Sequence, residues 1–233
     1  MKLALIGRGA MGQLVASEAR AAGHELGYVV STEHQTETAE ELAQHLRGHD
    51  AAIDFSNAEA VFRNVAACVR AGVPLIEGTT GWREHDQVRR MVTEGDGALV
   101  FGANFSIGMN IFYRIVKSAS EHFSQMDQYA PFIEEAHHSR KRDAPSGTAI
   151  QLGKLMGEKF QKEIPTSSTR AGHIPGTHRV GFDSPADQVL LTHTARSRQG
   201  FASGALLAAR WIVGRKGVFE FGEIIEEILT RES

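Results

Sequence analysis

Short apolar runs alternate with segments of helical spacing through the first hundred positions of the chain. The run at 3–6 leads through several glycines into a segment whose apolar residues recur at helical spacing, namely Met11, Leu14, Val15 and Ala19. The same criteria predict strands at 25–30, 51–55, 74–77 and 98–101, and helices at 38–46, 58–71 and 84–93. This regular alternation predicts an α/β fold with a doubly wound parallel sheet.

The pattern changes after residue 104. A helix is predicted at 109–119, and the later segments predict strands at 132–136, 177–182 and 189–194 and helices at 146–160, 202–213 and 221–229. We therefore expect a first domain over 1–104 and a second, α+β domain with a mixed or antiparallel sheet over 105–214. Residues 215–233 are expected to return to the first domain. The segment 162–176, rich in Ser, Thr, Pro and Gly, is predicted to be a mobile loop.

Composition and charge narrow the classes of function. The chain has 233 residues, 42% of them hydrophobic and 23% charged, with a formal net charge of −3, which excludes a disordered chain and argues against a nucleic-acid binder. The single cysteine, Cys68, lies in an apolar helical pattern and favours a reducing compartment. No export signal or membrane span is expected, because the longest uncharged stretch, 97–113, is interrupted by Gly and Asn. We expect a cytoplasmic protein.

The first candidate site is the glycine turn between the first strand and the first helix. Gly7 allows a tight turn, Gly9 lets a pyrophosphate approach the backbone, and Gly12 lets the helix pack on the strand. This βαβ context predicts a Rossmann-like domain that binds NAD or NADP. The alternative is a glycine turn that binds another nucleotide or no ligand.

The acidic residue that usually ends the second strand of an NAD-binding unit is missing here. Ser31 and Thr32 occupy that position, so the usual argument for a preference for NAD fails. Neutral side chains do not repel a 2′-phosphate, but they supply no guanidinium for it. Use of NADP would then require help from Arg8 or His34.

Two more loops follow predicted strands of the same sheet. They are 78–81 (Gly-Thr-Thr-Gly) and 103–106 (Ala-Asn-Phe-Ser). Ligands of open α/β sheets bind at the carboxyl ends of the strands, so we expect these loops to line the ribose and the nicotinamide. The alternative is that either loop is an ordinary turn.

The densest group of chemically active side chains lies at 134–148. Ser146 is a good N-cap, and the free N–H groups of Gly147 and Thr148 favour a carboxylate or phosphate at the start of the next helix. Lys141 is suited to pair with the same anion, and His137 or Lys141 to donate a proton. The alternative is a solvated basic loop before a capped helix.

No metal site is expected in this cluster. His137 and His138 are adjacent, so on a strand their side chains point to opposite faces, and no cysteine joins them. His173, His178 and His193 are interpreted as loop or surface residues. The chain also lacks the Gly-x-Ser-x-Gly, Walker lysine and His-Glu-x-x-His motifs, which disfavours serine hydrolases, P-loop NTPases and zinc peptidases.

The segment 135–149 (EAHHSRKRDAPSGTA) resembles, without a gap, the long signature of the 4-hydroxy-tetrahydrodipicolinate reductase (dihydrodipicolinate reductase) family of lysine and diaminopimelate biosynthesis. The segments 78–81, 103–110, 170–176 and 201–204 are also similar to that family. The resemblance implies hydride transfer from NADH or NADPH to a cyclic, imine-bearing dicarboxylate with loss of water. It also implies a homotetramer, built through the sheet of the second domain, and a C-terminal helix that rejoins the first domain.

The resemblance implies a role for each matching residue. His137 resembles the proton donor, and Lys141 its partner in protonation and in carboxylate binding. The other substrate contacts implied are His138, Ser146, Gly147 and Thr148. The implied cofactor-binding residues are Gly7, Arg8, Gly9, Ala10, Met11, Gly12, Gly78, Thr79, Thr80, Ala103, Asn104 and Phe105. Ser31 and Thr32 are also expected to contact the cofactor, because of their position after the second strand.

The chain departs from the family at Ser31 and Thr32, which replace an acidic-basic pair, and its segment 31–50 is short. Both departures bear on the choice and the affinity of the coenzyme. Two alternatives stay open at this point. One is an amino-acid dehydrogenase of the aspartate type, and the other is a dinucleotide sensor without turnover.

Overall fold

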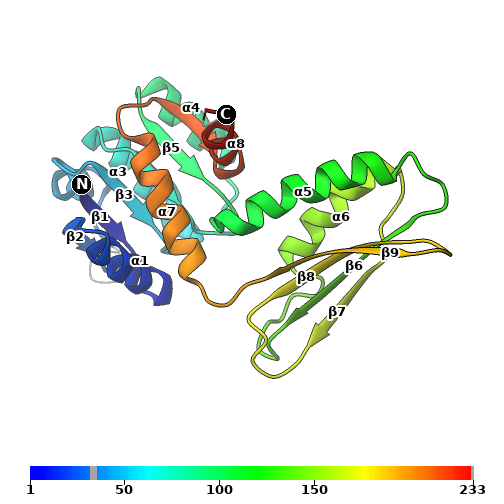
Figure 1. The fold of residues 1–233 in the computed structure, drawn as a ribbon. Coiled ribbons are helices and arrows are strands. Elements are labelled where there is room, and N and C mark those ends of the chain that lie inside the picture. The colour runs from blue at the N-terminus through cyan, green and yellow to red at the C-terminus, as the bar shows by residue number, and fades with distance from the viewer. Residues whose placement is uncertain (32–35, 232–233) are drawn as a thin grey trace. The chain divides into compact units, whose positions relative to one another are not determined.

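The computed structural model describes residues 1–31 and 36–231, and the chain forms two units (Figure 1). The first unit combines Met1–Ile107 with Arg198–Ser233, and the second is Gly108–Ser197. The chain thus returns to the first unit at residue 198, whereas the hydrophobic pattern places the return at 215. The reason is that helix α7 (Gln199–Ile212) packs against strands of the first unit.

The sheet of the first unit has six strands, all parallel, in the order β10-β5-β4-β3-β1-β2. Their bounds are β1 Lys2–Ile6, β2 Glu25–Val30, β3 Ala51–Asp54, β4 Leu75–Glu77, β5 Ala98–Phe101 and β10 Gly217–Glu220. Strands β3 and β4 are buried along their whole length, as expected for a sheet covered on both faces. The predicted doubly wound sheet is confirmed, and β10 is a strand that the sequence pattern did not predict.

Helices cover both faces of this sheet. Helices α1 (Ala10–Ala21) and α7 pack together on one face, and α2 (Ala39–Leu46), α3 (Val61–Ala71) and α4 (His85–Glu94) pack on the other (Figure 1). A short 3-10 turn, Ala58–Ala60, precedes α3, and α8 (Phe221–Arg231) closes the unit. Gly72 ends α3 in the left-handed conformation with φ 68°, a backbone shape that glycine adopts without strain.

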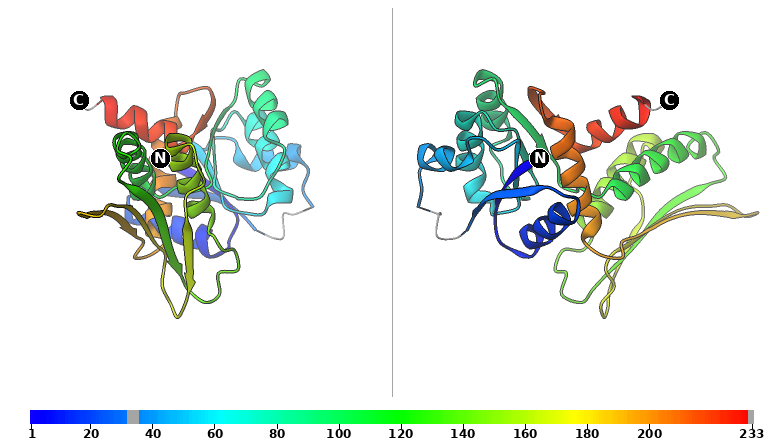
Figure 2. Two further views of the ribbon diagram at one scale, coloured as in Figure 1. Left: turned by 90° about the vertical axis from the view of Figure 1, so that its right-hand side faces the viewer. Right: turned by 60° about the vertical axis from the view of Figure 1, so that its left-hand side comes forward.

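The second unit contains a mixed four-stranded sheet in the order β7-β6-β8-β9. Its strands are β6 Ala130–His137, β7 Thr166–Arg170, β8 Thr177–Asp183 and β9 Gln188–Thr194. Helices α5 (Ile107–Phe123) and α6 (Gly147–Phe160) cover one face of it (Figure 2). Strand β6 alternates strictly, so that Ile133, Glu135 and His137 share the buried face. The alternation that builds the core therefore also buries two polar side chains.

The predicted mobile loop at 162–176 is not a loop throughout, because it contains strand β7. The strand pairs in parallel with β6, and its residues (Thr-Ser-Ser-Thr-Arg) are mostly exposed. An edge strand without a buried apolar face lacks the alternation by which strands are recognised. Backbone hydrogen bonds to β6 hold β7 in its extended conformation. These bonds involve no side chain, so the pattern of apolar and polar residues does not predict them.

No helix among residues 1–31 and 36–231 is long and apolar enough to cross a membrane.

Close packing of α7 on the first sheet requires small residues. A Cβ atom on Gly204 would lie 1.8 Å from the backbone oxygen of Phe105, a distance that no relaxed structure tolerates. Four alanines of the same helix are also fully buried, namely Ala202, Ala205, Ala208 and Ala209. The segment 201–204, which is similar to the reductase family, thus contains a position, Gly204, where only glycine fits.

We predict that Gly204→Ala destabilises the first unit by about 1–3 kcal/mol, although alanine is the better helix former. Urea unfolding followed by circular dichroism measures the difference. Gly200→Ala is the matched control in the same helix, because its Cβ would meet only the Ser106 hydroxyl, at 3.6 Å. Equal stabilities of the two variants would contradict the steric argument.

Candidate active site

The glycine turn after β1 is dictated by contacts of the backbone. Gly7 has φ +99°, and a Cβ atom there would lie 2.5 Å from the Phe55 oxygen, while a Cβ on Gly12 would lie 2.0 Å from the Gly7 oxygen. At Gly9, by contrast, nothing lies within 4 Å of the Cβ position. Gly7 and Gly12 therefore serve packing, and Gly9 leaves open space at the N-terminus of α1.

This helix end is suited to an anion. Gly9 is the N-cap of α1 and supplies no side chain to bond the first N–H groups, which belong to Ala10 and Met11, and the first turn contains no acidic residue. Helix α2 provides a contrast, because Thr38 and Glu41 form a capping box at its start. The uncapped α1 end keeps its N–H groups available for a phosphate.

A cavity of about 970 Å³ opens beside the glycine turn, within the first unit. Of the predicted cofactor residues, Gly7, Arg8, Gly9 and Ser31 line it. Its other lining residues are Ile6, Gln13, Val30, Phe55, Ser56, Asn57, Glu59, Ala60 and Arg63. A cavity of this size beside an anion-ready helix end fits a dinucleotide. Thr32 and His34 lie outside the described residues.

Sequence reasoning missed the wall formed by residues 55–57, 59, 60 and 63. A signal was present, because Ser56 and Asn57 follow a buried strand, as the 78–81 and 103–106 loops do. Arg63 is the more informative addition. It lines the same cavity as Ser31, and its guanidinium donates to the Glu37 backbone oxygen at 3.2 Å and to the Asn64 side chain.

The other two predicted cofactor loops are not among the described residues that line this cavity. Thr79, between Gly78 and Thr80, still reaches its edge, because its hydroxyl accepts a hydrogen bond of 3.1 Å from the Ser56 N–H. Asn104, next to Ala103, accepts one from the Ser106 N–H at 2.9 Å and so shapes the turn before α5. Phe105 is buried against Phe55 and Phe221, so packing accounts for its side chain.

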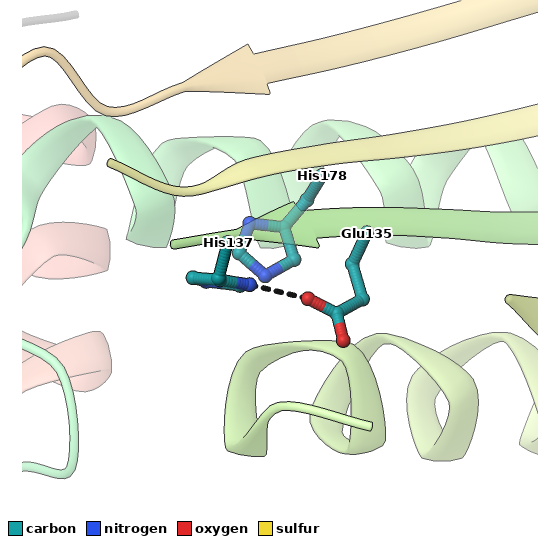
Figure 3. Close-up of side chains that lie close together, drawn as sticks. All are labelled: Glu135, His137 and His178. Carbon is teal, nitrogen blue, oxygen red and sulfur yellow. Dashed lines mark hydrogen bonds and ion pairs between the residues drawn. The ribbon is translucent and has the colours of Figure 1, made fainter. Parts of the chain in front are cut away.

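The second unit gathers polar side chains on the buried face of its sheet (Figure 3). Glu135 and His137 are two residues apart on β6, and His178 lies opposite Glu135 on β8. Their exposed fractions are 2%, 8% and 5%. His137 Nδ1 is hydrogen-bonded to the Glu135 carboxylate, and the two imidazole centroids are 5.1 Å apart. The interpretation of His178 as a loop or surface residue is therefore wrong.

Arg170 compensates the buried charge of Glu135. It lies in register with His137 on β7, and its guanidinium donates to Glu135 Oε1 at 2.6 Å and to the Asp143 backbone oxygen at 2.5 Å. Burial raises the pKa of Glu135, but hydrogen bonds from Arg170, Ser168 and His137 outweigh that effect and lower the pKa to about 2. The carboxylate is therefore ionised across the physiological range.

An ionised Glu135 fixes the tautomer of His137. A carboxylate accepts hydrogen bonds only, so Nδ1 must carry the hydrogen that joins the two groups. Burial lowers the pKa of His137, the bond to Glu135 raises it, and Lys141 and Arg170 lower it again, with a net decrease. A Cβ on Gly176 would lie 3.1 Å from Nε2, so this glycine keeps the space beside that nitrogen clear.

His178 and Ser146 anchor the start of α6. The Ser146 side chain caps α6 by accepting from the Ala149 N–H at 3.2 Å, and its hydroxyl lies 3.1 Å from His178 Nε2. Burial and the neighbouring His137 lower the pKa of His178 to about 4. His178 is therefore neutral near pH 7, and it joins β8 to the helix end.

The loop before α6 already presents a carboxylate to the predicted anion site. Lys141 Nζ lies 2.9 Å from Asp143 Oδ1, and the Asp143 carboxylate also accepts a hydrogen bond from the Gly147 N–H. Thr148 is bonded to Tyr113 of α5, and His138 is half-buried just beyond β6. Lys141 and the α6 end thus converge on one acidic group.

Glu135, His137 and His178 are also residue types that bind metals, and one ligand atom from each lies within 4.8 Å of the others. The expectation of no metal site overlooked His178, which the fold brings to the pair. Both oxygens of Glu135 are, however, already engaged, Oε1 by Arg170 and Oε2 by His137. A bound cation would compete with Arg170 for the same carboxylate, so we assign these residues a hydrogen-bonding role.

We predict that Glu135→Gln lowers the free energy of unfolding by about 2–3 kcal/mol near neutral pH. The folded pKa lies below the ordinary value of 4.5, so this stability is present above 4.5 and is lost as the pH falls toward 2. Urea unfolding at a series of pH values should show the deficit shrinking below about pH 4.5.

The control is Glu134→Gln on the exposed face of the same strand. Its ion pair with Arg179, at 3.6 Å, is exposed to solvent and contributes little. A deficit in Glu135→Gln that stays constant from neutral to acidic pH would contradict the assignment of the low pKa.

Comparison with known proteins agrees with this geometry. The family models for the N-terminus and C-terminus of dihydrodipicolinate reductase match residues 1–105 and 108–225. A 4-hydroxy-tetrahydrodipicolinate reductase from Christiangramia forsetii is 33% identical over 241 residues, covering 98% of this chain and 99% of the relative. One from an Anaeromyxobacter species is 34% identical, covering 80% and 76%.

Solved structures support the fold. The dipicolinate-bound dihydrodipicolinate reductase from Paenisporosarcina sp. TG-14 superimposes with a TM-score of 0.79 at 22% identity, covering 94% of this chain and 97% of that one. The family models and the relatives span nearly the whole sequence, both units included. This chain belongs to the dihydrodipicolinate reductase family.

Proposed function

We propose that this protein reduces 4-hydroxy-tetrahydrodipicolinate to tetrahydrodipicolinate, with loss of water, in diaminopimelate and lysine biosynthesis. The observation that carries the proposal is the buried Arg170–Glu135–His137 chain beside a cationic, capped helix end. Such a site offers a proton and binds carboxylates, which are the two needs of an imine-bearing dicarboxylate. NADH or NADPH, when bound, supplies the hydride.

The first unit holds the dinucleotide. The N–H groups of Ala10 and Met11 at the open α1 end bind its pyrophosphate, and Gly9 permits the close approach. Ser31, Arg8 and Arg63 line the same cavity, so two arginines lie beside a second strand that ends without an acid. This arrangement supports use of both coenzymes, and Thr79 and Asn104 shape the turns on the nicotinamide side.

His137 donates the proton. Glu135 holds the Nδ1 hydrogen, which leaves Nε2 as the nitrogen that takes up a proton and passes it to the substrate. Burial lowers the pKa of His137 and makes its imidazolium a stronger acid. The negative charge of Glu135 raises this pKa and so favours formation of the imidazolium. Gly176 leaves room beside Nε2 for the reacting ring.

Lys141, Gly147, Thr148, Ser146 and His138 bind the carboxylates of the substrate. In this structure, the Asp143 carboxylate bonds both Lys141 and the Gly147 N–H. A substrate carboxylate therefore binds by exchange with Asp143, which keeps the two donors oriented until the exchange. We further propose that the protein works in the cytoplasm as a homotetramer.

The test is a coupled assay in which aspartate semialdehyde, pyruvate and the preceding synthase generate the unstable substrate. We expect oxidation of NADH or NADPH that depends on both the synthase and this protein. His137→Gln should lower kcat by roughly 10²-fold or more, because it removes the general acid.

The control is His173→Gln, which changes an exposed histidine of the same unit and should leave kcat unchanged. Wild-type turnover in His137→Gln would exclude the assigned proton donor. Folded protein that oxidises neither coenzyme would instead favour an amino-acid dehydrogenase, detected with a panel of amino acids, or a sensor, detected by calorimetry with the dinucleotides.

Lys141→Ala should raise KM and lower kcat, each by roughly 10-fold or more, because it removes a charged hydrogen bond to a carboxylate. The inhibition constant of dipicolinate, a planar dicarboxylate, measures the binding part separately from turnover. Lys154→Ala, at an exposed position on α6, is the matched control. Unchanged dipicolinate inhibition in Lys141→Ala would show that the anion site lies elsewhere.

A further inference from the structure

Two buried carboxyl groups in the first unit have no part in the chemistry proposed above. Asp54 and Glu77 are the last residues of β3 and β4, and they lie opposite each other in the parallel register. Both are 0% exposed, and their side chains are hydrogen-bonded to each other. Uncompensated burial of two acids is costly, so their retention at the strand ends needs an explanation.

The hydrogen bond between them requires a proton. Two ionised carboxylates have acceptors only, so one of the pair must be protonated. Glu77 Oε2 is buried and receives no hydrogen bond from any N–H or O–H of the described residues. This oxygen is therefore the one on which we place the shared proton. Burial raises the pKa of Glu77 well above its ordinary value, and the Asp54 charge raises it further. The pair therefore keeps one proton and one negative charge near pH 7.

The remaining oxygens hold the two loops at the strand ends. Asp54 Oδ1 accepts from the Ser56 N–H at 2.8 Å, and Glu77 Oε1 accepts from the Thr79 N–H at 2.7 Å. The Ser56 N–H also reaches the Thr79 hydroxyl at 3.1 Å, which ties the loops to each other. Ser56 lines the dinucleotide cavity, so the pair is one residue removed from the cavity wall.

A second set of hydrogen bonds connects Asp54 to Arg63, a cation that lines the cavity. Asn64 donates to Asp54 Oδ2 at 2.7 Å and to the Ser56 hydroxyl at 3.3 Å. The oxygen of the same amide accepts from the Arg63 guanidinium at 2.9 Å and 3.2 Å. Arg63 lines the cavity together with Ser31. The pair thus orients two parts of the cavity wall: it accepts directly from the Ser56 and Thr79 N–H groups, and it reaches Arg63 through Asn64.

The other ionisable groups near the pair do not replace its proton. On α3, the buried Cys68 thiol has its pKa raised by burial and by both carboxyl charges, so it is neutral. The same helix carries two cations, Arg63 and Arg70. Asn64 separates Arg63 from Asp54, and Arg70 forms an ion pair with Glu40 at 3.7 Å. Glu59, which precedes α3, lines the cavity but makes no bond to either acid among the contacts described.

We propose that Asp54 and Glu77 form a one-proton positioning pair, which holds Ser56, Thr79 and Arg63 in the conformation that binds the dinucleotide. Loss of the shared proton leaves two negative charges side by side in the core, which separates the strand ends and weakens dinucleotide binding. The inference rests on the proposed function only in the identity of the ligand, NADH or NADPH.

The experiment is a fluorescence titration of NADH and NADPH against the full-length protein, without substrate, from about pH 6 to pH 10. Wild-type affinity should fall on the order of tenfold as the pH rises and the pair loses its proton. Glu77→Gln keeps an acceptor for Thr79 and a donor for Asp54 without a titrating proton. It should therefore bind like wild type near pH 7 and show no alkaline loss.

Glu59→Gln is the matched control, because it removes an acid from the same cavity and should keep the alkaline loss. Asp54→Asn puts an amide N–H where the Asn64 amide or the Ser56 N–H donates, so it should weaken binding at every pH. Alkaline loss that persists in Glu77→Gln, or a flat wild-type profile, would overturn the proposal.

Infrared spectroscopy of the wild-type protein gives a readout that does not depend on folding of the variants. A protonated carboxyl band should be present near pH 7 and disappear over the pH range in which affinity falls, and its absence near pH 7 would overturn the proposal.

The coupled reductase assay is scored separately. Dinucleotide titrations that follow the expected pH dependence, in a protein without reductase activity, would reject the proposed function and still support the one-proton pair.

Discussion

Burial of the Glu135 carboxylate beside Arg170 is the interaction on which the second unit's site depends. An ionised carboxylate in a core is tolerated only when cations and donors surround it, and here Arg170, Ser168, Ser146 and His137 provide them. The exposed, polar strand β7 meets this requirement, because its pairing with β6 places Arg170 in register with His137. The same carboxylate then sets the tautomer of the imidazole.

The two units use buried acids in opposite ways. Glu135 faces a guanidinium, and its pKa falls to about 2, so it is a permanent charge. Burial and the neighbouring Asp54 both raise the pKa of Glu77, so it retains a proton. In each case the acid points inward from a strand, and burial together with a partner on the neighbouring strand decides its charge. Permanent charge orients a proton donor, and a retained proton keeps two loops together.

Several elements were predicted from the sequence because their signals are local. The parallel strands of the first unit, the stop of α3 at Gly72 and the Ser146 cap of α6 all follow from short patterns of apolar, glycine and capping residues. Strands β7 and β10 were missed, and the chain's return to the first unit was placed too late. Those features depend on pairing with β6 and β5 and on packing of α7, all of them contacts between distant parts of the chain.

The sequence by itself determined the glycine turn, the anion-ready helix ends and the resemblance to the reductase family, because each rests on neighbouring residues. Only the tertiary structure showed that Arg170 and His178 join Glu135 and His137, that Arg63 shares a cavity with Ser31, and that Asp54 meets Glu77. The physical reason is strand register: it brings residues far apart in the chain within hydrogen-bonding distance, and burial there sets their charge.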